Sequence, residues 1–270
     1  MIQQLNLSPS QIEYIYQNTD LALALFNYLS FDNLPTKKEI AIWAFEYFRF
    51  NPLTQLKEFE NQFLGISEGY DSEYDEFFWE DPNSAFPSQT LPSLALFEGS
   101  FPKRSDRSFD TPPKLYTFIG GNLLTKVGGS GAGINTCAAR VSMALNYSGV
   151  KIPHIPEITF SGKDGKYYFL GAANLNRWMQ KTFGCSNPNT SIGEYFTANS
   201  LHYNKNQIGT NGEKLKQLLQ GINGIYSMVS NNFNWAAGHP DLIKSAPEPI
   251  CDGACHFDGP VQYIDVWKLH

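Results

Sequence analysis

The chain has 270 residues, of which 42% are hydrophobic and 17% charged, and its net charge is −6. This composition is ordinary for a globular protein with one large domain or two modest ones. The longest apolar runs, such as residues 21–26, are far too short to span a bilayer, and the first residues lack the features of a Sec signal peptide. We therefore expect a protein made in the cytoplasm. The C-terminal part lacks the basic run that a nucleic-acid site needs, so we do not expect nucleic-acid binding.

Charge divides the chain into two regions. Residues 1–110 carry seven Lys and Arg against seventeen Asp and Glu, whereas residues 111–270 carry thirteen against nine. The resulting net charges, −10 and +4, indicate regions with different partners. We predict an acidic, mainly helical N-terminal region with a linker over residues 1–112, and a second domain over residues 113–270.

The N-terminal region shows helix signals. Ser8-Pro9 is typical of a helix start, and apolar residues from Ile12 to Phe26 follow at helical spacing. A capping box at residues 36–39 predicts another helix, ended or bent by Pro52, and a third is expected over about 54–64. The acidic, aromatic residues 71–81 are either a solvated loop or a docking surface. Proline-rich loop sequence follows, and residues 103–115 are expected to be the linker.

A cysteine stands where the first helix of the second domain should begin. The glycine-rich residues 128–133 precede Cys137, either Asn135 or Thr136 can cap the helix, and Gly149 ends it. A thiol at a helix N-terminus lies at the positive end of the helix dipole, which favours the thiolate nucleophile. A small buried core cysteine is the alternative.

The remaining elements predict an α+β domain. A hairpin is expected at residues 160–169, and a helix whose apolar face runs from Leu175 to Phe183 ends at Gly184. A short helix is expected at 213–220, and strands at 225–229, 241–243 and 261–267. A cysteine-bearing helix followed by an antiparallel sheet is an α+β arrangement.

His239 is the candidate base among five histidines. It follows Gly238 and directly precedes the strand that begins at Asp241, where its ring is free to face a cleft. Alone it would be unremarkable. A cysteine upstream of a histidine, however, is the order found in papain-like thiol enzymes.

Two further cysteines flank a short turn. Cys251 and Cys255 can form a disulfide in an oxidising compartment, with Gly253 supplying the permissive backbone. They could instead bind zinc together with His256, although the fourth ligand would have to be Cys185. We expect the disulfide and treat Cys185 as a buried or spare thiol.

A disulfide loop would hold Asp252 rigidly enough to orient His239, and Asp241 is the alternative orienter. Asp241 shares a strand face with His239, because successive side chains of a strand alternate. Contact between such close positions is uncommon. The larger rate loss is therefore expected from Asp252→Asn.

The segment around Cys137 resembles the nucleophile block of the fourth family of type VI secretion amidase effectors. The matching residues run from Asn135 to Arg140, and include Ser142, residues 144–146, Gly149 and residues 152–153. Residues 238–242 resemble the family's histidine block, and the cysteine loop and residues 263–269 resemble its C-terminal elements. The resemblance covers about residues 113–270 and leaves the N-terminal region outside.

The resemblance implies a papain-like, NlpC/P60-type domain that hydrolyses the γ-D-glutamyl–meso-diaminopimelate bond of peptidoglycan stem peptides. Cys137 would be the nucleophile, His239 the base and the loop acid the orienter, with Asn135 and Gly238 next to the substrate. In this chain the acid directly follows the first loop cysteine, so Asp241 stays open as the third member.

The family resemblance also implies partners and a destination. Its members are delivered by a type VI secretion machine into the periplasm of another bacterium, and a cognate immunity protein blocks the cleft. No cofactor, metal or membrane insertion is expected. The N-terminal region would load the effector onto the machine, cover the cleft or extend the fold.

Two rival functions are kept. One is a non-catalytic binding or structural protein, with zinc held by Cys251, Cys255 and His256. The other is a papain-fold protease or transferase that acts on protein amides.

Overall fold

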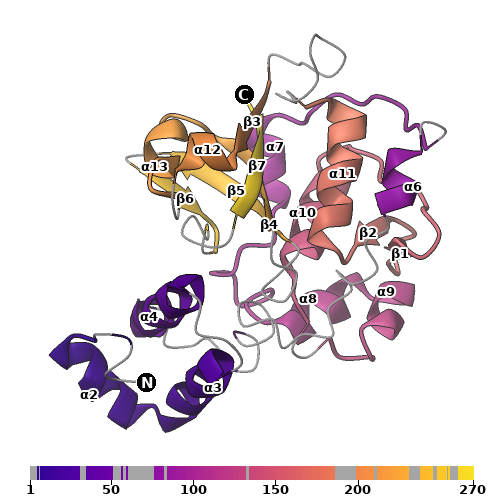
Figure 1. The fold of residues 1–270 in the computed structure, drawn as a ribbon. Helices are drawn as coiled ribbons and strands as arrows, with labels where there is room; N and C mark the ends of the chain where they lie inside the picture. Colours follow the sequence, from indigo (N-terminus) through magenta and orange to yellow (C-terminus); the bar gives the residue numbers. More distant parts are fainter. Residues whose placement is uncertain are drawn as a thin grey trace.

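Figure 1 shows the computed structural model of the chain. The structure describes residues 5, 7–30, 35–50, 56, 59, 76–81, 84–131, 134–185, 199–209, 212–230, 238–245, 248–253, 255 and 261–270. Within these residues the fold is a mixture of helices and antiparallel strands, which confirms the predicted α+β class. None of the helices described is long and apolar enough to cross a bilayer.

Three helices form the N-terminal group: α2 (Pro9–Gln17), α3 (Thr19–Ser30) and α4 (Pro35–Phe50). The predicted capping at Ser8 is confirmed, since its side chain accepts from the Gln11 N–H. The apolar pattern expected to run to Phe26 is split between two helices, because α2 ends at Gln17, Asn18 is its C-cap and α3 begins at Thr19. Helix α4 ends before Pro52, and the helix predicted over 54–64 lies largely outside the described residues.

Residues before the predicted boundary at 112/113 pack into the core of the second region. They include α6 (Glu76–Glu80) and α7 (Leu94–Ser100). Helix α7, which is capped by Ser93, lies within the segment that was expected to be a loop. Phe97 and Phe101 are buried in the same cluster as α10 and α11, and the indole N–H of Trp79 donates to Asn174 at 2.7 Å. The core of the second region therefore extends N-terminally at least to α6.

The cysteine helix is confirmed as α10 (Cys137–Tyr147), with Gly149 beyond its end at a φ of +97°. Two short helices precede it, α8 (Pro112–Ile119) and α9 (Gly121–Lys126). The predicted hairpin is β1 (Thr159–Ser161) paired with β2 (Tyr167–Phe169), and α11 (Ala172–Phe183) ends at Gly184 as expected.

A five-stranded antiparallel sheet follows, with the strand order β3-β7-β4-β5-β6. Its strands are β3 (Ser200–Asn204), β4 (Gly224–Ser230), β5 (Gly238–Ser245), β6 (Pro249–Cys251) and β7 (Val261–Lys268), with α12 (Lys205–Ile208) and α13 (Leu215–Leu218) between β3 and β4. Strands β4, β5 and β7 were predicted, whereas β3 and β6 were not. Strand β5 begins at Gly238, so His239 lies inside the strand and not before it.

The two faces of the sheet belong to different hydrophobic clusters. Leu242 packs with residues of α10 and α11, whereas the neighbouring Ile243 belongs to a cluster that also contains buried residues of α2, α3 and α4. Because side chains alternate along a strand, His239 and Asp241 share the face of Ile243. Figure 1 shows α10 and α11 to one side of the sheet and the N-terminal helices as a separate group below it.

Strand β6 covers only part of the edge of β5. It pairs with residues 243–245, so within the part of the chain that the structure describes, Gly238 to Leu242 pair with a strand on one side only, namely β4. Beyond β6 the chain still reaches β5 once, where the Asp252 N–H donates to the Leu242 carbonyl at 3.2 Å. Pro240 stands in the middle of this stretch, all of whose residues are buried.

Candidate active site

Cys137 lies at the first position of α10, where the sequence placed it. Its backbone N–H donates to Oδ1 of Asn135 at 3.0 Å, so Asn135 satisfies the first N–H of the helix. Thr136 makes no cap, because its hydroxyl accepts from Nε of Arg140. Cys137 is only 2% exposed, and α10 packs against β5.

His239 and Asp241 are in direct contact on β5. Nε2 of His239 lies 3.4 Å from Oδ2 of Asp241, and both residues are buried. The backbone N–H groups of Leu242 and Gly253 donate to the two oxygens of the same carboxylate, at 2.8 and 2.9 Å. A buried carboxylate with these donors is held in place and can fix the orientation of the imidazole.

Asp252 has a different partner. Its Oδ2 accepts from the backbone N–H of Arg104 at 2.8 Å and lies 3.9 Å from the Arg104 guanidinium. Within the described residues, the hydrogen bonds and ion pairs of the Asp252 side chain all go to Arg104. The geometry thus brings the alternative orienter, Asp241, to His239, whereas Asp252 contacts Arg104.

Arg104 is the site residue that the sequence did not reveal, since residues 103–115 were expected to be linker. Its Nη1 lies 3.3 Å from Oδ2 of Asp241. Gly253 allows this approach, because a Cβ there would lie 2.5 Å from Arg104 Nη1. The segment is fixed by Arg140, which donates to the carbonyls of Pro102 and Phe109. The residue pattern around Arg104 could not predict its contact with Asp241, because the fold brings together two residues that are distant in the sequence.

Burial and charge together set the protonation of the site. Burial lowers the pKa of His239 below its ordinary value, and the nearby Arg104 charge adds to this against the opposing effect of Asp241. Burial alone would raise the pKa of Asp241, but its hydrogen bond from His239 and the charge of Arg104 outweigh burial, and the pKa is lowered. Burial and the charge of Asp241 raise the pKa of Asp252.

The electrostatics also connect Arg104 to Cys137. Although burial disfavours its charge, the pKa of Arg104 is raised by Asp241, Tyr47, Asp252 and Cys137. One guanidinium therefore lies within electrostatic range of the helix cysteine, both aspartates and a tyrosine of α4. A neutral imidazole beside an ionised carboxylate is the combination that can accept a proton from a thiol.

The remaining predicted site residues are Gly238 and the two loop cysteines. Gly238 pairs with Val229, and a Cβ at this position would lie 2.5 Å from the Met228 carbonyl oxygen. Cys251 and Cys255 form a disulfide with their Cα atoms 5.2 Å apart, so neither sulfur is a thiolate that could bind zinc. His256, the third member of the rival zinc site, lies outside the described residues.

Comparison with known families decides the class of protein. Residues 134–258 match the family of type VI secretion system amidase effector protein 4, Tae4. This segment belongs to the Tae4 family. The match confirms the recognition made from the sequence and the predicted enzyme class, an amidase.

Solved structures of Tae4 proteins are also similar to this chain. Tae4 of Salmonella Typhimurium, crystallised with Tai4, is 23% identical with a TM-score of 0.49, and the match covers 67% of this chain and 100% of that one. Tae4 of Enterobacter cloacae is 19% identical with a TM-score of 0.47, covering 68% of this chain and 99% of that one. No curated protein matches the chain.

Proposed function

We propose that this Tae4 chain is an antibacterial effector that hydrolyses the γ-D-glutamyl–meso-diaminopimelate amide of peptidoglycan stem peptides. Three observations support the proposal: Cys137 begins a helix that packs against β5, His239 and Asp241 of β5 are in buried contact, and residues 134–258 match the Tae4 family. A helix that begins with the cysteine and packs on the histidine strand fits a papain-like, NlpC/P60-type domain.

In this mechanism His239 takes the Cys137 proton and the thiolate attacks the amide carbonyl. The resulting imidazolium, held by Asp241, gives its proton to the leaving amine, and a thioester remains on Cys137. His239 then removes a proton from water, the hydroxide attacks the thioester, and the acid product leaves with Cys137 restored.

Asn135 affects how the oxyanion, which forms when the thiolate attacks the carbonyl, is stabilised. The Cys137 N–H that would stabilise it donates to the Asn135 side chain in this structure, so that side chain must turn away or be displaced when the substrate carbonyl arrives. Asn135 therefore occupies the position of the reacting oxygen until substrate binds.

The partners and destination follow from the proposed function. A type VI machine would deliver the effector into the periplasm of the target cell, and a cognate immunity protein would protect the producer. The Tae4 of Salmonella Typhimurium was crystallised with Tai4, which provides the precedent for such a partner. The disulfide of Cys251 and Cys255 suits an oxidising compartment.

We further propose that the amidase domain begins N-terminal to Trp79 and not at residue 113. The burial of Trp79, Phe97 and Phe101 with α10 and α11 supports this assignment. Helices α2, α3 and α4 share a hydrophobic cluster with the sheet face that carries His239, and this contact supports the hypothesis that the N-terminal region covers the cleft.

The deciding experiment is digestion of purified peptidoglycan, with the products identified by mass. We expect stem peptides cut between D-glutamate and meso-diaminopimelate, and no products from Cys137→Ala protein of unchanged circular dichroism. Equal turnover by the wild type and the Cys137→Ala variant would refute the assignment. Release of protein fragments without wall products would favour the protease alternative.

A further inference from the structure

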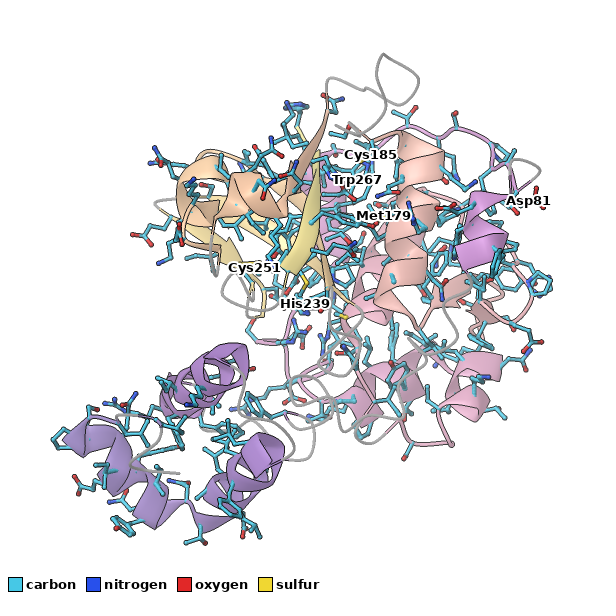
Figure 2. All side chains as sticks on the ribbon, viewed as in Figure 1. Asp81, Met179, Cys185, His239, Cys251 and Trp267 are labelled. Atoms are coloured by element: carbon cyan, nitrogen blue, oxygen red, sulfur yellow. A yellow bond between two sulfur atoms is a disulfide. The ribbon has the colours of Figure 1, made fainter. Side chains whose placement is uncertain are left out.

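A second buried Cys-His-Asp group lies away from the catalytic residues. Cys185 follows the end of α11, and His202 of β3 stands directly opposite Asp265 of β7 in the sheet register. Sγ of Cys185 lies 3.1 Å from Oδ1 of Asp265, Nδ1 of His202 lies 2.7 Å from the same oxygen, and the sulfur and nitrogen are 4.0 Å apart. Figure 2 shows Cys185 near the end of α11 and well separated from His239.

Cys185 and Asp265 are buried, His202 is nearly so, and the three side chains converge on one point. Asp265 is fully buried, Cys185 is 4% exposed, and the His202 side chain is 10% exposed. Within the described residues, this is the group whose sulfur, nitrogen and carboxylate donors all lie within 4.8 Å of one another. Neither the amidase mechanism nor the disulfide uses any of the three.

A second layer of contacts orients the donors. The other oxygen of Asp265 accepts from the side-chain amides of Asn176 and Gln180, at 2.9 and 2.8 Å. This leaves Oδ1 directed at Cys185 and His202. The His202 ring stacks on Tyr263, with the ring centroids 5.0 Å apart. Metal ligands are commonly held by such outer hydrogen bonds and packing.

The chemistry of the donors selects the ion. Thiolate and imidazole are ligands that zinc accepts, whereas magnesium and calcium require oxygen. Zn²⁺ bound to one thiolate, one carboxylate and a neutral imidazole has no net charge, which suits a buried site. The donor separations of 2.7–4.0 Å bracket those of a tetrahedron with zinc bonds of about 2.0–2.3 Å.

We propose that Cys185, His202 and Asp265 form a zinc site that joins the end of α11 to strands β3 and β7, with a water molecule as the fourth ligand. Binding replaces the thiol proton, which is released to solvent, by the metal.

The test uses full-length Cys137→Ala protein, in which Cys185 is the one cysteine outside the disulfide. Titration with Co²⁺ alone, followed by Zn²⁺, is expected to give one bound metal with a thiolate-to-cobalt absorption band that zinc abolishes. In the Cys137→Ala background, Cys185→Ser should remove the band, and His202→Gln should weaken binding by about tenfold or more. The matched comparison is the Cys137→Ala protein with and without the Cys185→Ser change. The second buried free thiol, Cys137, is absent from both proteins and cannot bind cobalt in either.

A second measurement needs no change at the site. Zinc chloride should slow alkylation of Cys185 at least about tenfold in mild denaturant and raise the thermal midpoint of the Cys137→Ala protein. An absent cobalt band, a band unchanged by Cys185→Ser, or an alkylation rate unaffected by zinc would each overturn the proposal. These readouts are independent of peptidoglycan hydrolysis, so their failure leaves the proposed amidase function standing.

Discussion

The carboxylate of Asp241 lies 3.4 Å from the ring of His239, two residues earlier on the same strand. In a regular strand, such positions are separated by about 6.6 Å along the chain, so the two side chains must lean together. Gly253 and Arg104 hold the same Asp241 oxygen, at 2.9 and 3.3 Å, and thereby fix where it stands. The pair is thus assembled by two segments that are remote from it in sequence.

The first prediction compares the two candidate orienters. Asp241→Asn should lower kcat/KM on a stem-peptide substrate by at least about a hundredfold, because it removes the charge that stabilises the His239 imidazolium. Asp252→Asn should have the smaller effect, since its partner is Arg104. This reverses the order expected from the sequence. A larger loss for Asp252→Asn would restore the original assignment.

The second prediction concerns Arg104. Its charge lowers the pKa of both His239 and Asp241, so Arg104→Met should move the acidic limb of the kcat/KM–pH profile to higher pH and reduce the maximum rate. Arg104→Lys, which keeps the charge, should restore much of the profile. Arg107→Met changes an exposed arginine of the same segment and serves as the control. An acidic limb that does not move in Arg104→Met would contradict a positioning role.

The third prediction is a pH dependence of stability. The pKa of His239 is lower in the folded protein than its ordinary 6.5, so the unfolded chain binds the proton more readily. This contribution is complete above about pH 6.5 and is lost as the pH falls through the folded pKa. Urea unfolding of wild type between pH 7.5 and 5 should show this loss, and His239→Gln should flatten the curve over that window. Identical pH dependence in both proteins would rule it out.

The fourth prediction concerns the N-terminal helices. Removing residues 1–75 keeps Trp79, α7 and Arg104, and should expose the sheet face that carries His239. We expect iodoacetamide to label Cys137 several-fold faster in the truncated protein, with higher peptidoglycan turnover. Removing residues 1–110 should instead abolish activity, because it deletes Phe97, Phe101 and Arg104. Unchanged labelling after the shorter deletion would argue against a cover.

Local signals predicted the elements that local chemistry determines. The start of α10 at Cys137, its end before Gly149, the hairpin after Ser161 and the stop at Gly184 all follow from capping, alternation and glycine backbone freedom. The cysteine and histidine were identified because their residue types and order are chemically distinctive.

The contacts that complete the site were beyond such signals. The ion pair between Arg104 and Asp241 joins residues 137 positions apart, and no periodicity records it. Similarly, the sequence places Trp79 in an acidic segment expected to be a loop or a docking surface, whereas in the fold its indole N–H donates to Asn174 in the core. Cys185 seemed a spare thiol because its partners, His202 and Asp265, come together only through the pairing of β3 with β7.

The partly covered edge of β5 has a consequence for how substrate is recognised. Proline has no N–H, the Leu242 N–H is taken by the Asp241 side chain, and the Leu242 carbonyl is taken by Asp252. An extended peptide therefore finds almost no backbone ladder to join beside His239. The same arrangement leaves few backbone groups through which two copies of this chain could pair along their reactive strands.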